Sequence, residues 1–169
     1  MSLVSKTRAV APSLLVAMAL LAATATPARA DITAFIGLSP TPERHTVKGF
    51  SGGLSLIVVG FEFEYANLGE DEDTLAASPS LKTYSGNVLL QTPVELKGTQ
   101  FYGTAGAGGY QESLGAVDET HFGLNFGGGV KIRVLGPVRL RLDYRVFRLK
   151  GEPLYPTYHR FYAGANLAF

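Results

Sequence analysis

The sequence predicts an all-β fold: an eight-stranded, antiparallel, up-and-down transmembrane β-barrel that follows a cleaved signal peptide. Three observations lead to this prediction. Apolar and polar residues alternate over long stretches, no segment after residue 30 is long and apolar enough for a membrane-spanning helix, and the connections between stretches alternate in length. A closed barrel satisfies its own backbone hydrogen bonds, so a chain without such a helix can still cross a membrane.

The clearest alternation is a hairpin over residues 122–149. Its first arm alternates apolar residues and glycine with polar residues and glycine, up to a turn at residues 135–137. The second arm has an apolar face and a charged face, formed by Leu140, Leu142, Tyr144 and Val146 and by Arg139, Arg141, Asp143 and Arg145. This period of two predicts long β-strands. Either the charged face meets bulk water, or the apolar face meets lipid and the charged face lines a lumen.

The first thirty residues read as a signal peptide. Lys6 and Arg8 give a positive start, residues 14–23 are apolar, and residues 28–30 form a small-x-small cleavage pattern. We expect cleavage before Asp31, which leaves residues 31–169 as a single outer-membrane β-barrel domain.

The composition of the remaining chain excludes several classes of function. Removing 30 of the 169 residues leaves 139, and it removes three of the 15 basic residues, so that 12 basic residues face 14 acidic ones. Such a balance offers no basic surface for a nucleic-acid partner. The chain has no cysteine, which excludes thiolate metal sites and cysteine nucleophiles.

The first half of the barrel domain supplies three strands. We expect them at residues 32–38, 47–56 and 61–65, with a loop at 39–45, a short connection at 57–60 and a second loop at 67–80. The loop at 39–45 holds two prolines, which the middle of a sheet does not tolerate. The third strand reads Phe-Glu-Phe-Glu-Tyr, with aromatic residues on one face and glutamates on the other.

The second half supplies five more strands. We expect them at residues 81–90 and 98–111, in the two arms of the hairpin, and at 158–169, with a short connection at 91–94 and loops at 113–120 and 150–157. Glycines in the strand at 98–111 permit the tight coiling of a small barrel. Short turns at one end and longer polar loops at the other are typical of bacterial outer-membrane barrels.

Four segments resemble a known family, at residues 60–65, 122–131, 139–145 and 162–169. They are similar to those of small outer-membrane β-barrel domain proteins of the OmpA/OmpX type. The resemblance implies the outer membrane of a diderm, Gram-negative-type bacterium, and it implies no single activity. It also implies that the barrel-assembly machinery reads the terminal strand, through Tyr162, Leu167 and Phe169. We expect no peptidoglycan-binding domain after Phe169.

The charged faces are expected to line the lumen, which eight strands make just wide enough for side chains. The predicted network is Glu62, Glu64, Lys131, Arg133, Arg139, Arg141, Asp143, Arg145 and Arg160. Six cations there outnumber three anions, and an unpaired buried charge is costly. The excess is therefore expected to be hydrated or paired with acids from the loops, in a plugged lumen without an open pore.

The apolar faces are expected to meet lipid, so that outer-membrane lipid and lipopolysaccharide are the predicted partners. The lipid-facing residues are Ile36, Phe63, Tyr65, Val88, Leu124, Phe126, Val130, Leu140, Leu142, Tyr144, Phe161, Leu167 and Phe169. We expect the eighth strand to pair with the first, which removes both sheet edges. Both chain ends should be periplasmic and the longer loops extracellular.

Catalysis, cofactors and metals are not expected. His45, His121 and His159 lack the close spacing of a metal site, and solvated histidines at the loop rim are the preferred interpretation. Ser113 and His121 flank one loop that also holds Asp118 and Glu119, but nothing in the sequence fixes a catalytic geometry.

The predicted function is therefore a structural or surface-interaction role. Two alternatives stay open on the sequence alone: a narrow channel for a solute or protons, and a soluble, lipocalin-like barrel that binds a ligand inside.

Overall fold

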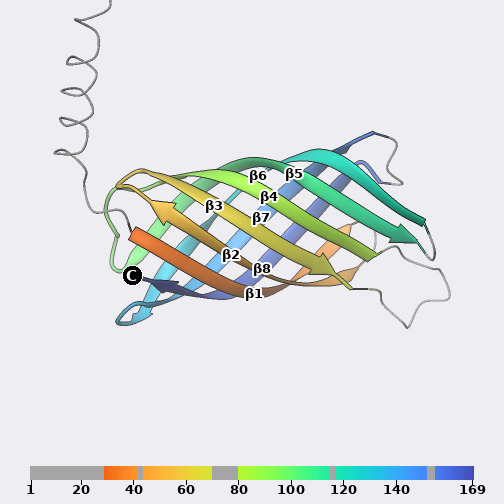
Figure 1. The fold of residues 1–169 in the computed structure, drawn as a ribbon. Coiled ribbons are helices and arrows are strands. Elements are labelled where there is room, and N and C mark those ends of the chain that lie inside the picture. The colour runs from red at the N-terminus through yellow and green to blue at the C-terminus, as the bar shows by residue number, and fades with distance from the viewer. Residues whose placement is uncertain (1–28, 42–43, 70–79, 115–116, 152–154) are drawn as a thin grey trace, which may run out of the picture.

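The computed structural model describes residues 29–41, 44–69, 80–114, 117–151 and 155–169, and in them eight strands form a closed barrel (Figure 1). The strands are β1 (Arg29–Thr41), β2 (His45–Ser55), β3 (Val59–Leu68), β4 (Ser80–Gln91), β5 (Thr99–Leu114), β6 (Val117–Leu135), β7 (Val138–Lys150) and β8 (Thr157–Ala168). Within these ranges, no helix has the length and apolar character needed to cross a membrane.

Every strand pairs antiparallel with the next along the chain, and β8 closes the barrel against β1. At the end of this seam, Phe169 exchanges two backbone hydrogen bonds of 2.9 Å with Ala30, a residue that the predicted cleavage before Asp31 would remove. We call the end that holds these two residues and the turns after β2, β4 and β6 the turn end, and the opposite end the loop end (Figure 1). The predicted closure of the first strand on the eighth is confirmed, and the described sheet has no free edge.

Side chains alternate between the inside and the outside of the barrel along each strand. On β7, Leu140 and Leu142 are 39% and 41% exposed, whereas Arg141 between them is fully buried. All thirteen residues predicted to face lipid lie on the outside: eleven are exposed, and Tyr65 and Val130 are half-buried. A soluble ligand-binding barrel would have the reverse arrangement, with its apolar faces inside. The structure therefore favours the transmembrane interpretation of the alternation.

Most strands are longer than the sequence predicted, and β1 continues to Thr41 instead of ending at Leu38. Its pairing with β8 shifts between Leu38 and Thr41, which is a β-bulge. Pro40 lies in this interruption, where the backbone N–H that proline lacks is not needed for the ladder. The Ser39 hydroxyl donates to the His159 carbonyl at 2.9 Å and connects β1 to β8 across the bulge.

The loop predicted at residues 113–120 is also wrong. β5 has 16 residues and β6 has 19, and their register runs up to the pair Leu114–Val117. Polar residues on both faces hide the alternation at this end of the hairpin. Residues 1–28 of the predicted signal peptide and most of the predicted loop at 67–80 lie outside the described residues, and the cleavage before Asp31 stays a prediction.

The face assignment predicts the effect of a charge placed on the outer surface. Leu142 lies near the middle of β7, so Leu142→Arg should place a cation near the middle of the membrane. We expect this variant to lose about 2–4 kcal/mol of folding free energy in a bilayer. The measurement is urea unfolding of the barrel in lipid vesicles, followed by gel mobility before and after boiling.

Leu135→Arg is the matched control, because Leu135 is 77% exposed at the turn end of β6. Near the membrane interface the same substitution should cost only about 0–1 kcal/mol. Equal stability of both variants and the wild type would show that the outer face does not meet lipid.

Candidate functional site in the charged lumen

The inside of the barrel carries most of the charged residues that the sequence predicted there. Eight of the nine predicted network residues are buried in the lumen: Glu62, Glu64, Lys131, Arg139, Arg141, Asp143, Arg145 and Arg160. Arg133 is the exception, since its side chain is 52% exposed at the turn end, where it pairs with Glu95 at 2.6 Å. The alternation along β6 would place it inside, but β6 ends at Leu135 and the side chain leaves the barrel there.

Arg141 is the centre of the network, and it reaches from β7 across the lumen to β3. Its guanidinium donates to both carboxylate oxygens of Glu62, and its Nη2 lies 3.1 Å from Asp143. Arg141 Nε also donates to the Tyr102 hydroxyl at 2.7 Å, and that hydroxyl donates to Asp143. This guanidinium therefore joins three strands through charge-assisted hydrogen bonds.

Arg145 repeats this arrangement two inward positions further along β7. Its Nη2 donates to Glu62 at 2.8 Å, its Nε donates to Asp143 at 3.0 Å, and its Nη1 lies 3.2 Å from Glu64. Arg141 and Arg145 thus share the carboxylates of Glu62 and Asp143. Both guanidiniums are fully buried, so water does not screen these interactions.

Two glycines on β6 leave room in the lumen for these long side chains. Gly129 on β6 faces the lumen, and a Cβ atom there would lie 2.6 Å from the Tyr102 hydroxyl oxygen. At Gly127, a Cβ atom would lie 2.9 Å from the Cα atom of Arg145. Glycine at these two positions therefore allows Tyr102 and Arg145 to enter the lumen.

Arg160 lies opposite Arg145 in the register of β7 and β8 and pairs with Glu64 across the barrel. Its guanidinium carbon lies 4.4 Å from the centre of the Phe147 ring, in a cation–π contact. Tyr162 on the same strand stacks on Phe35, with 4.1 Å between ring centres. Charged and aromatic side chains meet at this level of the lumen.

Beyond Arg160 the inside of the barrel becomes apolar. On β7 the inward residues change from Arg145 to Phe147 and Leu149, which are 3% and 6% exposed. They belong to a buried cluster that we call the apolar layer, which begins beside the charged network at Phe35 and Tyr162 and continues toward the loop end: Phe35, Val47, Ala66, Leu68, Leu81, Tyr110, Phe147, Leu149, Tyr158 and Tyr162. Sequence reasoning missed it, because it assumed that the inward positions stay polar along the whole strand.

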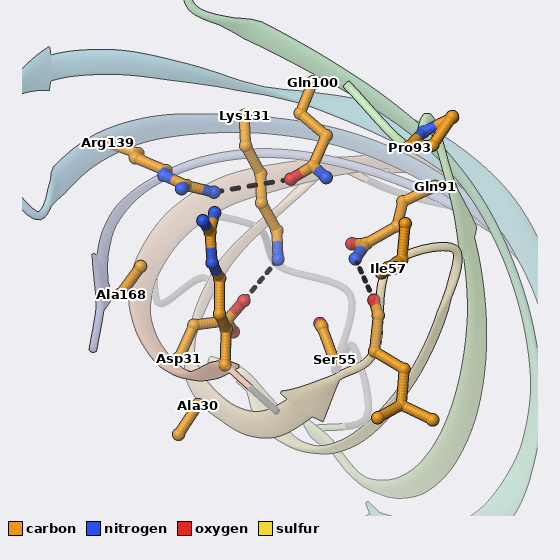
Figure 2. Close-up of a pocket in the computed structure, with 12 residues that line it drawn as sticks. Ala30, Asp31, Ser55, Ile57, Gln91, Pro93, Gln100, Lys131, Arg139 and Ala168 are labelled. Carbon is orange, nitrogen blue, oxygen red and sulfur yellow. Dashed lines mark hydrogen bonds and ion pairs between the residues drawn. The ribbon is translucent and has the colours of Figure 1, made fainter. Parts of the chain in front are cut away.

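The turn end of the lumen holds a polar cavity of about 240 Å³ (Figure 2). Lys131 pairs there with Asp31, and Arg139 donates to Gln100 at 3.3 Å and pairs with Glu95 at 2.9 Å. Gln91 donates to the Leu56 carbonyl at 3.0 Å on the opposite wall. Figure 2 shows Lys131 pointing toward Asp31 and Arg139 toward Gln100 around the cavity.

The carboxylates of Asp31 and Glu95 offset part of the excess of cations over anions that the sequence predicted in the lumen. Asp31 is buried on the inward face of β1, and Glu95 lies in the connection between β4 and β5. Asp31 precedes the outward-facing Ile32, and this alternation could have identified Asp31 as a residue of the lumen. Glu95 had no such signal, because a connection has no periodic pattern. Tyr102 was also missed, since its neighbour Phe101 is aromatic as well and the two faces could not be told apart.

The histidines are placed differently from one another. His45 is buried and its Nδ1 donates to the Gly69 carbonyl at 3.2 Å, so the expectation of a solvated histidine is wrong there. His159 lies on the outer face, within 2.8 Å of the Tyr144 hydroxyl, and His121 is half-buried on β6. Across the described part of the chain, no group of three or more His, Cys, Asp or Glu residues could hold a metal ion.

The residues weighed for a hydrolytic site are separated by the register of β5 and β6. Ser113 is opposite Asp118, whereas His121 is opposite Tyr110, three ladder positions away. Three positions along a strand correspond to about 10 Å. The backbone therefore does not bring Ser113 and His121 into a nucleophile–base pair.

The terminal strand residues point in two directions. Leu167 and Phe169 are on the outer face and are 45% and 67% exposed, whereas Tyr162 points inward and is 4% exposed. Their role in barrel assembly stays a prediction.

Comparisons with known proteins agree with this geometry. A family model described as "Outer membrane protein beta-barrel domain" matches residues 10–169. The N-terminal β-barrel domain of OprF from Pseudomonas aeruginosa superposes with a TM-score of 0.63 at 14% identity, over 83% of this chain and 97% of that one. Neisserial surface protein A gives 0.60 at 16% identity, over 83% and 94% of the two chains.

Ail, the attachment invasion locus protein of Yersinia pestis, gives a TM-score of 0.54 at 14% identity, over 86% of this chain and all of its own, 100%. At such identities these structures show the fold alone. No curated protein sequence matches the chain.

The buried network predicts a large cost for the loss of one partner. Arg141→Met leaves Glu62 and Asp143 with less positive charge around them, so we expect a loss of about 3–5 kcal/mol in the free energy of unfolding. The measurement is guanidinium chloride unfolding in detergent micelles. In the double variant Arg141→Met/Glu62→Gln, part of this loss should be recovered, because the neutral glutamine replaces the carboxylate that has lost its Arg141 partner.

Arg133→Met is the control for this prediction, since Arg133 is half exposed in its pair with Glu95. It should change the free energy of unfolding by no more than about 1 kcal/mol. If Arg141→Met and Arg133→Met destabilise the barrel equally, the lumen network does not stabilise the fold.

Proposed function

The chain belongs to the outer membrane protein beta-barrel domain family, and we propose that it is a closed barrel with a structural and surface-interaction role. In this proposal the lumen is plugged by the ion-pair network, and the loop end is the part that meets other molecules. The single observation that carries the proposal is the burial of the paired charges at the centre of the lumen: Arg141, Arg145 and Glu64 are completely buried, and Glu62 and Asp143 are each 5% exposed.

Two layers in series support a closed lumen. The ion pairs between β3 and β7 cross the barrel at its middle, and most of the apolar layer lies beyond them toward the loop end. A hydrated ion that crosses would have to break the ion pairs and also give up its water in the apolar layer, which is costly.

The location and orientation follow from the family and from the ends of the barrel. Outer-membrane location is the property of the family, and the outer apolar face fits it. We propose that a signal peptide exports the chain in a Gram-negative-type bacterium, that the turn end is periplasmic and that the loop end faces the cell exterior. The two-residue turn at Gly136–Pro137 and the longer connection after β3 are consistent with this orientation.

We assign surface interaction to the loop end. β5 and β6, the two longest strands, are joined to each other at this end. Their connecting hairpin carries acidic residues in the sequence, Glu112, Asp118 and Glu119, and the connection after β3 holds a run of four more at residues 70–73. A partner for these segments would carry positive charge. Lipid and lipopolysaccharide are the proposed partners of the outer face, and the barrel-assembly machinery is the proposed partner of the terminal strand.

Catalysis forms no part of the proposal, since the register keeps Ser113 and His121 three ladder positions apart. A narrow channel remains the second candidate because of one observation. In the described part of the chain, Nε and Nη1 of Arg160 have no hydrogen-bond partner, next to the apolar layer. In a channel, these two N–H groups of Arg160 would bind water inside the lumen.

Conductance distinguishes the plugged barrel from the channel. We expect purified wild-type protein in planar lipid bilayers to give no steady conductance, because buried ion pairs cross the middle of the lumen. Insertion is verified on the same sample by gel mobility before and after boiling. A steady conductance that changes in Glu62→Gln would contradict the proposal and establish the channel.

A further inference from the structure

The polar cavity at the turn end is closed on its inner side. Residues from β1, β2 and every strand from β4 to β8 line it, and its volume of about 240 Å³ corresponds to about eight water molecules. On the inner side, Nζ of Lys131 lies 5.8 Å from the centre of the Tyr102 ring, which belongs to the network around Arg141. The predicted cleavage would remove Arg29 and Ala30 from the wall and would retain its other residues. The cavity is therefore a blind pocket that faces the turn end.

Lys131 has spare hydrogen-bond donors at this cavity. Its side chain is 2% exposed, and in the described ranges Asp31 is the residue that accepts a hydrogen bond from its ammonium group. Figure 2 shows this ammonium group directed toward the Asp31 carboxylate. An ammonium group carries three N–H donors, and a buried charge is costly unless its hydrogen bonds are made. Within this part of the chain, two donors of Lys131 are therefore left for a ligand in the cavity.

An excess of positive charge lies at this end of the lumen. At the turn end, the Glu95 carboxylate is shared by Arg133 and Arg139. Together with the pair of Lys131 and Asp31, the ion pairs described there hold three cations and two anions. In the middle of the lumen, by contrast, the described charges balance, with three guanidiniums against three carboxylates: Arg141, Arg145 and Arg160 against Glu62, Glu64 and Asp143. The cavity is therefore matched to a ligand that carries one negative charge.

A hydrogen-bond acceptor lies on the other side of the cavity. Nε2 of Gln91 donates to the Leu56 carbonyl at 3.0 Å, so the amide oxygen of Gln91 is left to accept a hydrogen bond from a ligand. Figure 2 shows Gln91 across the cavity from Asp31. One molecule with a carboxylate and a hydroxyl group would satisfy the Lys131 donors and this acceptor together.

We propose that this cavity binds a short-chain hydroxycarboxylate, which enters from the turn end. The carboxylate accepts hydrogen bonds from Lys131, with Arg139 as a second nearby charge, and the hydroxyl group donates to Gln91. Apolar residues from the connections after β2 and β4 also line the cavity and contact the short carbon chain: Leu56, Ile57 and Pro93. In the proposed orientation the ligand comes from the periplasm, but the binding itself does not depend on that orientation.

The test is a titration of lactate into the protein purified from the outer-membrane fraction in an uncharged detergent, followed by ligand-observed NMR. We expect saturable binding of lactate, and binding of lactamide, which has the hydroxyl group without the charge, that is weaker by about tenfold or more. Lys131→Met should weaken lactate binding by about tenfold or more as well. Lys82→Met is the matched control, because Lys82 lies on the outer face near the loop end of β4, and it should change lactate binding less than about twofold.

A comparison with propionate tests the hydroxyl contact. Propionate lacks the hydroxyl group, so the wild type should bind it about threefold or more weakly than lactate. Gln91→Met should remove this difference and leave the binding of propionate unchanged. Equal affinity of the wild type for lactate and propionate would overturn the assignment of a hydroxycarboxylate.

Lys131→Met leaves Asp31 without its partner, so the folding of this variant is verified by gel mobility before and after boiling. If it does not fold, Lys131→Met/Asp31→Asn, which removes both charges of the pair, takes its place with the same expected loss. No saturable binding of lactate by the wild type would overturn the proposal, and so would equal binding of lactate and lactamide. Undiminished lactate binding in a folded Lys131 variant, or an equal loss in Lys82→Met, would overturn it as well.

Discussion

The guanidinium of Arg141 connects β7 to Glu62 on the opposite side of the barrel, and most other features of the lumen depend on this contact. A fully buried arginine is stable only if carboxylates and hydrogen-bond acceptors surround it. Glu62, Asp143 and Tyr102 meet that requirement from three strands. Because the partners come from β3, β5 and β7, the pairing also fixes how far apart these strands can lie.

The need to give every polar group a partner inside a membrane explains why this barrel has charges inside and apolar residues outside, the reverse of a soluble protein. In lipid, every backbone group needs a partner within the sheet, so the strands must close into a barrel. Closure leaves a lumen that is just wide enough for side chains, and the alternation of each strand then sends one residue in two into it. The outward residues are left for lipid. On the outward face of β7, apolar Leu142 is followed by cationic Arg148 nearer the loop end, which is the order expected from the hydrocarbon region to the headgroups.

Much of this arrangement could be predicted from the sequence, because period-two alternation determines both the strands and their faces. The lipid-facing positions came from that pattern together with the alternating lengths of the connections and the family resemblance, and the pairing of the first and last strands followed from the barrel that these predict. Strand ends were less predictable, since polar residues on both faces of the β5–β6 hairpin resemble a loop.

Within the site, Glu62, Arg141 and Arg145 were recognisable because each alternates with apolar residues. Tyr102 and Glu95 were not, since one adjoins another aromatic residue and the other lies in a connection. The apolar layer around Phe147 and Leu149 could not be predicted either. It depends on how residues from several strands meet inside the barrel, which no single strand pattern describes.

The central claim is that the mature chain is a closed barrel with its apolar face in the outer membrane. The most direct measurement is gel mobility of the protein in a detergent-solubilised outer-membrane fraction, compared before and after boiling. A closed barrel with paired strand edges resists the detergent at room temperature, so the account predicts a different mobility for the unboiled sample. An unchanged mobility, with the protein recovered from the soluble fraction, would contradict the account.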